Sequence, residues 1–89
     1  MNHALKDPDA ILEYGFDLTD WLVDSDTIAN ASWTVPTGLT KGTETKTDTI
    51  TTVVISGGTA GNEYKITDRI TTTAGRVDDR SIMIVVAER

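Results

Sequence analysis

Cysteine is absent from this chain of 89 residues, so neither a disulfide bond nor a thiolate metal site can support the fold. Small secreted domains usually carry disulfides, and their absence favours folding in a reducing cytoplasm. The single histidine, His3, lies in a polar N-terminal stretch where nothing orients it as a base or a metal ligand. A catalytic serine is not expected either, because the chain has no second histidine to act as its base. We therefore expect no enzyme activity and no cofactor.

Long apolar runs are also missing. No stretch approaches the roughly 18–20 residues of a membrane span, and the first ten residues lack the pattern of a signal peptide. Basic residues are scarce, with eight Lys and Arg against fourteen Asp and Glu. Phosphate contacts need clustered Lys and Arg, so we expect binding to neither nucleic acid nor a membrane.

The formal charge of −6 is concentrated in the first third of the chain. Residues 27–89 are balanced, whereas residues 1–26 hold only Lys6 as a base. The acids of that segment are Asp7, Asp9, Glu13, Asp17, Asp20, Asp24 and Asp26. Such a segment either keeps the chain soluble or faces a basic surface on a partner protein.

The C-terminal part predicts two long strands joined by a turn at Gly75, which can adopt positive φ without steric strain. Apolar residues alternate on each side of this turn, as expected for one face of a pleated sheet. They are Tyr64, Ile66, Ile70 and Thr72 before it, and Ile82, Ile84 and Val86 after it. A hairpin is marginal alone, so other strands must pair with it.

Those other strands are predicted around residues 28–35, 39–46 and 49–56, with Ala29, Ala31, Trp33 and Val35 on one face of the first. Residues 14–18 fit a short strand; alternatively, residues 17–22 fit a single helical turn. We read residues 1–13 as an arm and 14–89 as one all-β domain. The prediction is an antiparallel β-sandwich of six or seven strands, immunoglobulin-like or fibronectin-III-like.

The segment from Gly61 to Tyr64 supports this fold, because a tyrosine at such a corner bonds the backbone a few residues upstream. Trp33 should fill the space between the sheets. Paired aspartates at turns could hold calcium, but capping of their own backbone is the ordinary role. The glycine-rich segment 56–61 lacks the ending of a phosphate loop, so we expect a connector without metal or phosphate.

Three of the five aromatic residues lie within eight positions, at Tyr14, Phe16 and Trp21. They serve either the core or a docking surface. The candidate partner-binding residues are Asp7, Asp9, Leu12, Tyr14, Phe16 and Trp21. The candidate structural residues are Trp33, Gly61, Tyr64 and Gly75. The threonine-rich stretch 39–52 is a candidate sheet edge for strand addition, guarded by Lys41 and Lys46.

Nearly the whole chain resembles small virion proteins of tailed bacteriophages. The matching segments are DPDAILEYGFDLTDWL, DSDTIANASWTVPTGLT and VVISGGTAGNEYKITDRITTTAGRVDDRSIMIVVAER. Leu18 stands where the family pattern commonly has tryptophan. The resemblance implies an immunoglobulin-like structural protein of the virion, in some cases described as a fibre–tail adaptor.

Its implied partners are other virion proteins, namely portal or neck, tail, fibre or major capsid protein, with several copies in each particle. Docking would use the N-terminal region, and an arm of residues 1–13 should be removable without unfolding the domain. Two alternatives stay open. One is a capsid decoration protein, and the other is a carbohydrate-binding module, which would need exposed aromatics along a groove.

Overall fold

The structure is a computed structural model that describes residues 2–87, with side chains from residue 4 onward. Its described part contains seven strands and no helix. The strands are β1 (Asn2–Lys6), β2 (Leu12–Asp17), β3 (Ile28–Thr34), β4 (Leu39–Lys46), β5 (Ile50–Gly57), β6 (Glu63–Thr72) and β7 (Val77–Val86). Accordingly, no described helix is long and apolar enough to cross a membrane.

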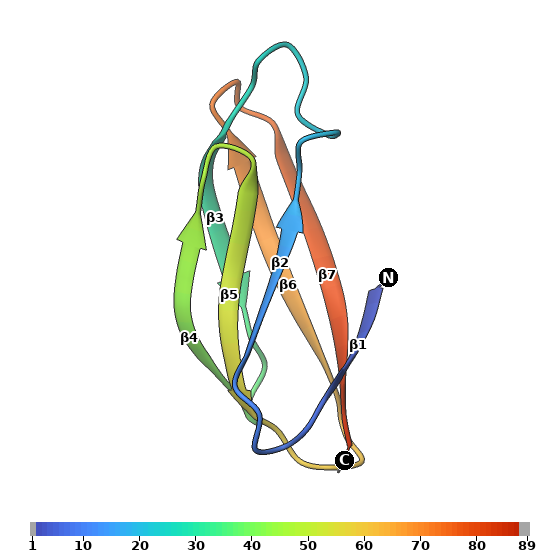
Figure 1. Ribbon diagram of the computed structural model, residues 1–89. Helices are drawn as coiled ribbons and strands as arrows, with labels where there is room; N and C mark the ends of the chain where they lie inside the picture. The colour runs from blue at the N-terminus through green and yellow to red at the C-terminus, as the bar shows by residue number, and fades with distance from the viewer. Residues whose placement is uncertain (1, 88–89) are drawn as a thin grey trace.

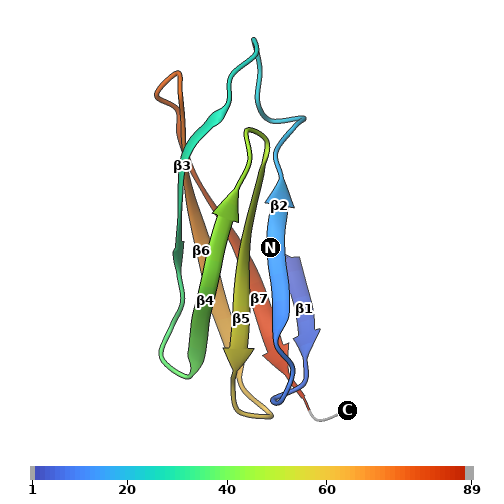
Figure 2. The same cartoon turned by 60° about the vertical axis from the view of Figure 1, so that its left-hand side comes forward.

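The strands form two facing sheets in a molecule of 44 × 22 × 19 Å (Figures 1 and 2). One sheet has the order β1-β7-β6-β3 and the other the order β2-β5-β4. All pairings are antiparallel except that of β1 with β7. The predicted all-β sandwich of six or seven strands is confirmed. For β2 to β7 the order agrees with immunoglobulin constant-type sheets, and the immunoglobulin-like assignment stays a prediction.

The N-terminal stretch differs from the expected arm. Residues Asn2–Lys6 lie parallel to Ile82–Val86, and the backbone N–H of Ala87 donates to the carbonyl of Lys6. The Lys6 side chain is fully buried, and its Nζ donates to the carbonyls of Gly57 at 2.6 Å and Asp7 at 2.9 Å. The polar sequence hid this strand, because one of its inward positions is a lysine whose stem packs while its ammonium caps carbonyl groups.

The core has two parts. The larger one lies between the sheets and includes Trp33, Val53, Ile55, Ile66 and Ile84. The smaller one, at the end shared by the β2–β3 loop and the β6–β7 turn, contains Leu18, Ile28 and Ile70. Period-2 apolar positions account for the first part. The indole Nε1 of Trp33 donates to the Thr51 hydroxyl at 3.1 Å, so the buried ring keeps a partner for its polar atom.

Two local details modify the predicted strand pattern. A register shift between Ile28 and Asn30 places Ile28 in the core and leaves Ala29 exposed, so Ala29 does not share the inward face of Trp33. A bulge of this kind cannot be read from alternation alone. After β2 the chain closes one helical turn, in which the N–H of Leu22 donates to the carbonyl of Leu18 at 3.0 Å. The strand and the turn therefore occur in succession.

The corner before β6 has the geometry of a tyrosine corner. The backbone N–H of Thr59 donates to the Tyr64 hydroxyl at 3.1 Å, and Gly61 precedes it with φ of 90°. A Cβ atom on Gly38 would lie 2.7 Å from the Tyr64 ring, so the ring packs directly against that backbone. In the β6–β7 turn Gly75 has φ of 92°.

Candidate docking surface

The predicted partner-binding residues do not form one site. Asp7 and Asp9 lie in the loop between β1 and β2 at one end of the sandwich, and Trp21 lies beyond β2 at the other end (Figure 1). Leu12, Tyr14 and Phe16 lie between them along β2. The set therefore follows one long side of the molecule.

Two of the three aromatic candidates pack partly against the central core. Tyr14 and Phe16 are half-buried, and Phe16 stacks on Trp33 with ring centroids 5.7 Å apart and an interplanar angle of 5°. Burial raises the pKa of the Tyr14 hydroxyl. Both rings are thus committed to the sandwich, although each lies on an edge strand and keeps one exposed margin.

Trp21 closes the far end of the sandwich. The guanidinium of Arg76 lies 4.2 Å from the ring centroid and that of Arg80 lies 5.5 Å from it. Arg76 Nη1 also donates to the Trp21 carbonyl at 3.3 Å. Two cations against one indole hold the loop onto the top of β7, so this tryptophan has a structural role.

Asp26 in the β2–β3 loop and Asp79 on β7 hold parts of the fold together. Asp26 Oδ1 accepts bonds from the N–H groups of Thr27 at 2.9 Å and Ala74 at 3.0 Å, which ties the β2–β3 loop to the hairpin. Asp79 forms a paired contact with Arg69 at 2.8 Å and 3.0 Å. Among the described residues no group of three or more metal-ligating side chains occurs. The side chain of His3 lies outside the described residues.

The opposite end, at the β1–β2 loop, exposes apolar and acidic side chains together. Leu5 is 56% exposed, Ile11 71% and Leu12 37%. Asp7 Oδ1 accepts the N–H of Asp9 at 2.9 Å, which shapes the loop, and the Asp9 side chain is exposed. Single exposed apolar residues are ordinary, but three within eight positions beside carboxylates are typical of a contact surface.

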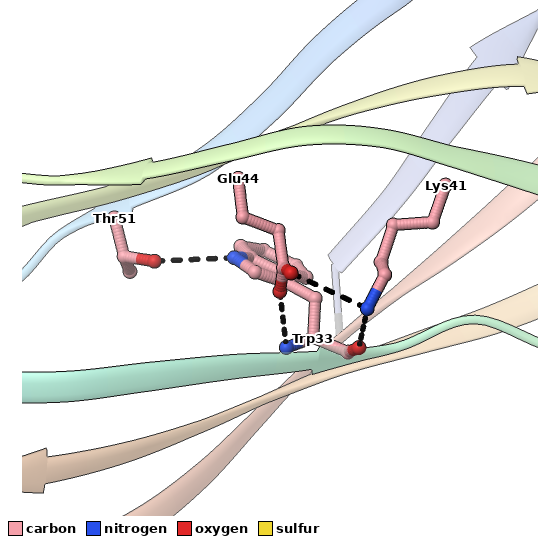
Figure 3. Close-up of polar contacts among 4 residues, drawn as sticks. All are labelled: Trp33, Lys41, Glu44 and Thr51. Atoms are coloured by element: carbon pink, nitrogen blue, oxygen red, sulfur yellow. Dashed lines mark hydrogen bonds and ion pairs between the residues drawn. The ribbon is translucent and has the colours of Figure 1, made fainter.

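Charged side chains of β4 reach the backbone of β3 at Trp33 (Figure 3). Glu44 Oε1 accepts the N–H of Trp33 at 2.9 Å, and Lys41 Nζ donates to the Trp33 carbonyl at 3.2 Å. Lys46 Nζ donates to the carbonyl of Ile28 at 3.1 Å. The three residues satisfy edge groups of β3, and a register shift between Lys41 and Glu44 bends β4. The sequence showed the lysines but not that they point across the gap between the sheets.

Sequence reasoning missed a buried carboxyl group. Asp68 is fully buried on β6 opposite Trp33, and neither of its oxygens has a hydrogen-bond partner in the described structure. Burial raises its pKa to about 6; the nearby Thr51 hydroxyl opposes this shift and the Glu44 carboxylate adds to it. The sequence pattern could have predicted this burial, because Asp68 alternates in step with Ile66 and Ile70 and so lies on the same inward face of β6.

The comparison with protein families gives one match. Residues 6–85 match the family described as podophage GP4 fiber-tail adaptor protein gp77. The chain belongs to this family. A comparison with curated proteins found no match. The match covers β2 to β6, all of β7 except Val86, and only the last residue of β1, and it confirms the resemblance to phage fibre–tail adaptors.

Membership defines the setting of the chain in coarse terms. An adaptor of this family is a structural component of a phage virion, which argues against an enzyme and implies contacts with other virion proteins such as tail and fibre. The described surface exposes apolar and acidic side chains on a β-sandwich, which is compatible with such contacts.

Proposed function

We propose that this chain is a non-enzymatic adaptor between the tail and a fibre of the virion, and that it docks through its N-terminal region in several copies per particle. Docking at this end is supported mainly by the exposure of two apolar side chains next to the acidic β1–β2 loop. Leu5 is 56% exposed and Ile11 is 71% exposed. Large aliphatic groups left in water at one end of a small sandwich gain free energy when a partner covers them.

The charge around this end favours a basic partner surface. Asp9 and Glu13 expose carboxylates here, and the nearby Lys6 presents no ammonium to a partner because its side chain is buried. Complementary charge mainly speeds association and selects the partner, while apolar contact supplies affinity. The two features together suit an assembly contact between different virion proteins.

Point substitutions test this end better than truncation. Removal of residues 1–13 would take β1 out of the sheet and uncover β7, so a failure to assemble would not separate docking from folding. Leu5→Ser combined with Ile11→Ser changes only exposed side chains and should leave the fold intact. Val77→Ser is the matched control, because this residue is 59% exposed at the other end of the sandwich.

Phage lacking the wild-type protein should be complemented by each variant, followed by measurement of its content in purified particles. We expect the double variant to be lost from particles and the Val77 variant to be retained. Normal incorporation of the double variant contradicts docking at this end. Electron cryo-microscopy of the particles then places the chain: density at the junction of tail and fibre supports the adaptor, and density across the capsid surface contradicts it.

A further inference from the structure

The two sheets have four edge strands, and two of them carry features that prevent pairing with another chain. On β3, the backbone N–H of Trp33 donates to Glu44, and the carbonyls of Trp33 and Ile28 accept hydrogen bonds from Lys41 and Lys46. The strand that supplies these residues, β4, is interrupted by its own register shift. Charged residues and bulges are the usual protection of sheet edges. The predicted edge at residues 39–52 is therefore protected against pairing with another strand.

The other sheet ends in β1, which has five residues and pairs in parallel with the last five positions of β7. Short edge strands offer few free backbone groups to a newcomer. The fourth edge, β2, differs from all three. It pairs with β5 without any register shift from Leu12 to Asp17, and its sequence LEYGFD contains no lysine, arginine or proline.

The register shows which backbone groups of β2 are free. The N–H of Leu18 donates to the carbonyl of Thr49 at 2.8 Å. Because bonded and non-bonded residues alternate in an antiparallel pair, Phe16 and Tyr14 also face β5 with their backbone groups. The N–H and C=O groups of Glu13, Gly15 and Asp17 consequently point away from β5, toward the open edge.

The side chains beside these free groups are acidic on one face of β2. Glu13 and Asp17 are exposed, and they flank Gly15, where a Cβ atom would lie 2.3 Å from the carbonyl oxygen of Thr51. The opposite face carries Tyr14 and Phe16, which are half-buried. A strand laid along this edge would meet carboxylates on one side and an apolar row on the other.

We propose that β2 is a strand-addition site, and that its occupant is an extended segment of another virion protein with alternating basic and apolar residues. Lys or Arg would lie opposite Glu13 and Asp17, and apolar residues opposite Tyr14 and Phe16. Backbone bonds supply affinity in such complexes, and the side chains select the partner. The proposal rests on the adaptor function and names the chemistry of its partner.

Charge also argues against a second copy of this chain as the occupant. Antiparallel pairing of β2 with itself about Gly15 would place Glu13 of each copy opposite Asp17 of the other. Like charges directly opposite each other destabilise a strand pair. The same two carboxylates that attract a basic segment therefore disfavour self-association at this edge.

The test uses the full chain and the synthetic peptide Val-Lys-Val-Thr-Val-Lys-Val, whose threonine would lie opposite Gly15. We expect ¹⁵N-resolved amide shifts at Glu13, Gly15 and Asp17, and binding weakened about tenfold or more when glutamate replaces both lysines of the peptide. Shifts centred on β1 or β4, no shifts at all, or equal binding of both peptides would overturn the proposal. Concentration-dependent dimerisation through β2, seen by light scattering without peptide, would also overturn it.

Two substitutions at one position separate backbone pairing from charge. Glu13→Pro removes a free N–H of the edge without breaking a bond to β5, and should abolish the peptide shifts while circular dichroism stays that of wild type. Glu13→Lys should weaken binding about fivefold and regain it with a peptide in which one lysine is glutamate. The regained binding of the matched peptide measures charge pairing even if the proline variant unfolds. If binding is not regained, the charge pairing is refuted. The adaptor function is tested separately by incorporation of the chain into particles. A failed peptide experiment therefore does not contradict that function.

Discussion

Replacement of Asp68 with asparagine should stabilise the domain at neutral pH. The carboxyl group is fully buried between the sheets and lacks a hydrogen-bond partner in the described structure. At pH 7 the wild-type fold must hold this group as a carboxylate without water, which opposes folding. Asparagine has nearly the same shape and no charge, so the substitution removes that opposition.

The size of the effect follows from the pKa, which burial raises from 3.8 to about 6. A raised carboxyl pKa means that the folded state binds its proton more tightly, so the favourable contribution is complete below 3.8 and is lost as pH rises through about 6. A difference of about 2 pKa units corresponds to about 3 kcal/mol. At pH 7 we therefore expect Asp68→Asn to gain up to about 3 kcal/mol, or about 10–20 °C in Tm.

Urea unfolding of both proteins at pH 3.5 and pH 7.5 measures this gain. The Asn variant should exceed wild type at pH 7.5 and lose most of that advantage at pH 3.5. The carboxylates of Asp17 and Asp79, which are exposed, and of Asp26, which is half-buried, have lowered pKa values. They therefore favour the fold above about pH 4 in both proteins and cancel in the difference. Asp48→Asn, in the exposed β4–β5 turn, is the control and should stay near wild type. A difference between Asp68→Asn and wild type that does not change with pH would refute the reasoning.

Three further substitutions test packing contacts of the sandwich. Gly15→Ala should lose about 1–3 kcal/mol in urea unfolding, because its Cβ would lie 2.3 Å from the Thr51 carbonyl oxygen; an unchanged midpoint would contradict this contact. Tyr64→Phe should lose about 1 kcal/mol in the same assay, since its hydroxyl accepts a backbone N–H at the corner. Arg76→Gln should lose about 1 kcal/mol and change the fluorescence of Trp21, whereas an unaltered spectrum would show that the guanidinium does not hold the ring.

Local signals predicted most of the strands. Pro36 and the Gly57–Gly58 pair mark the ends of β3 and β5, so the predicted ranges 28–35 and 49–56 differ from the structure by about one residue. The strand β1 was missed because an inward position is Lys6, whose burial depends on carbonyl groups elsewhere in the chain. Alternation cannot anticipate a lysine that packs inward.

The docking side depends on topology that one sequence does not contain. Acidic and aromatic residues on β2 were visible, but edge status follows from the order β2-β5-β4. The direction of Lys41 and Lys46 likewise follows from the position of β3 across the gap between the sheets. Residue types drew attention to the first third of the chain, whereas the arrangement of sheets decides which backbone groups stay free.

The separation of charge in the sequence has a structural cause. The basic residues Lys41 and Lys46 bind carbonyls of β3, and Arg76 and Arg80 hold Trp21. These cations are hydrogen-bonded to the backbone of β3 or packed on Trp21, whereas β2 itself carries the carboxylates of Glu13 and Asp17 and no basic residue. The contacts that protect the β3 and β4 edges have no counterpart at β2, whose edge carries carboxylates but no lysine or arginine.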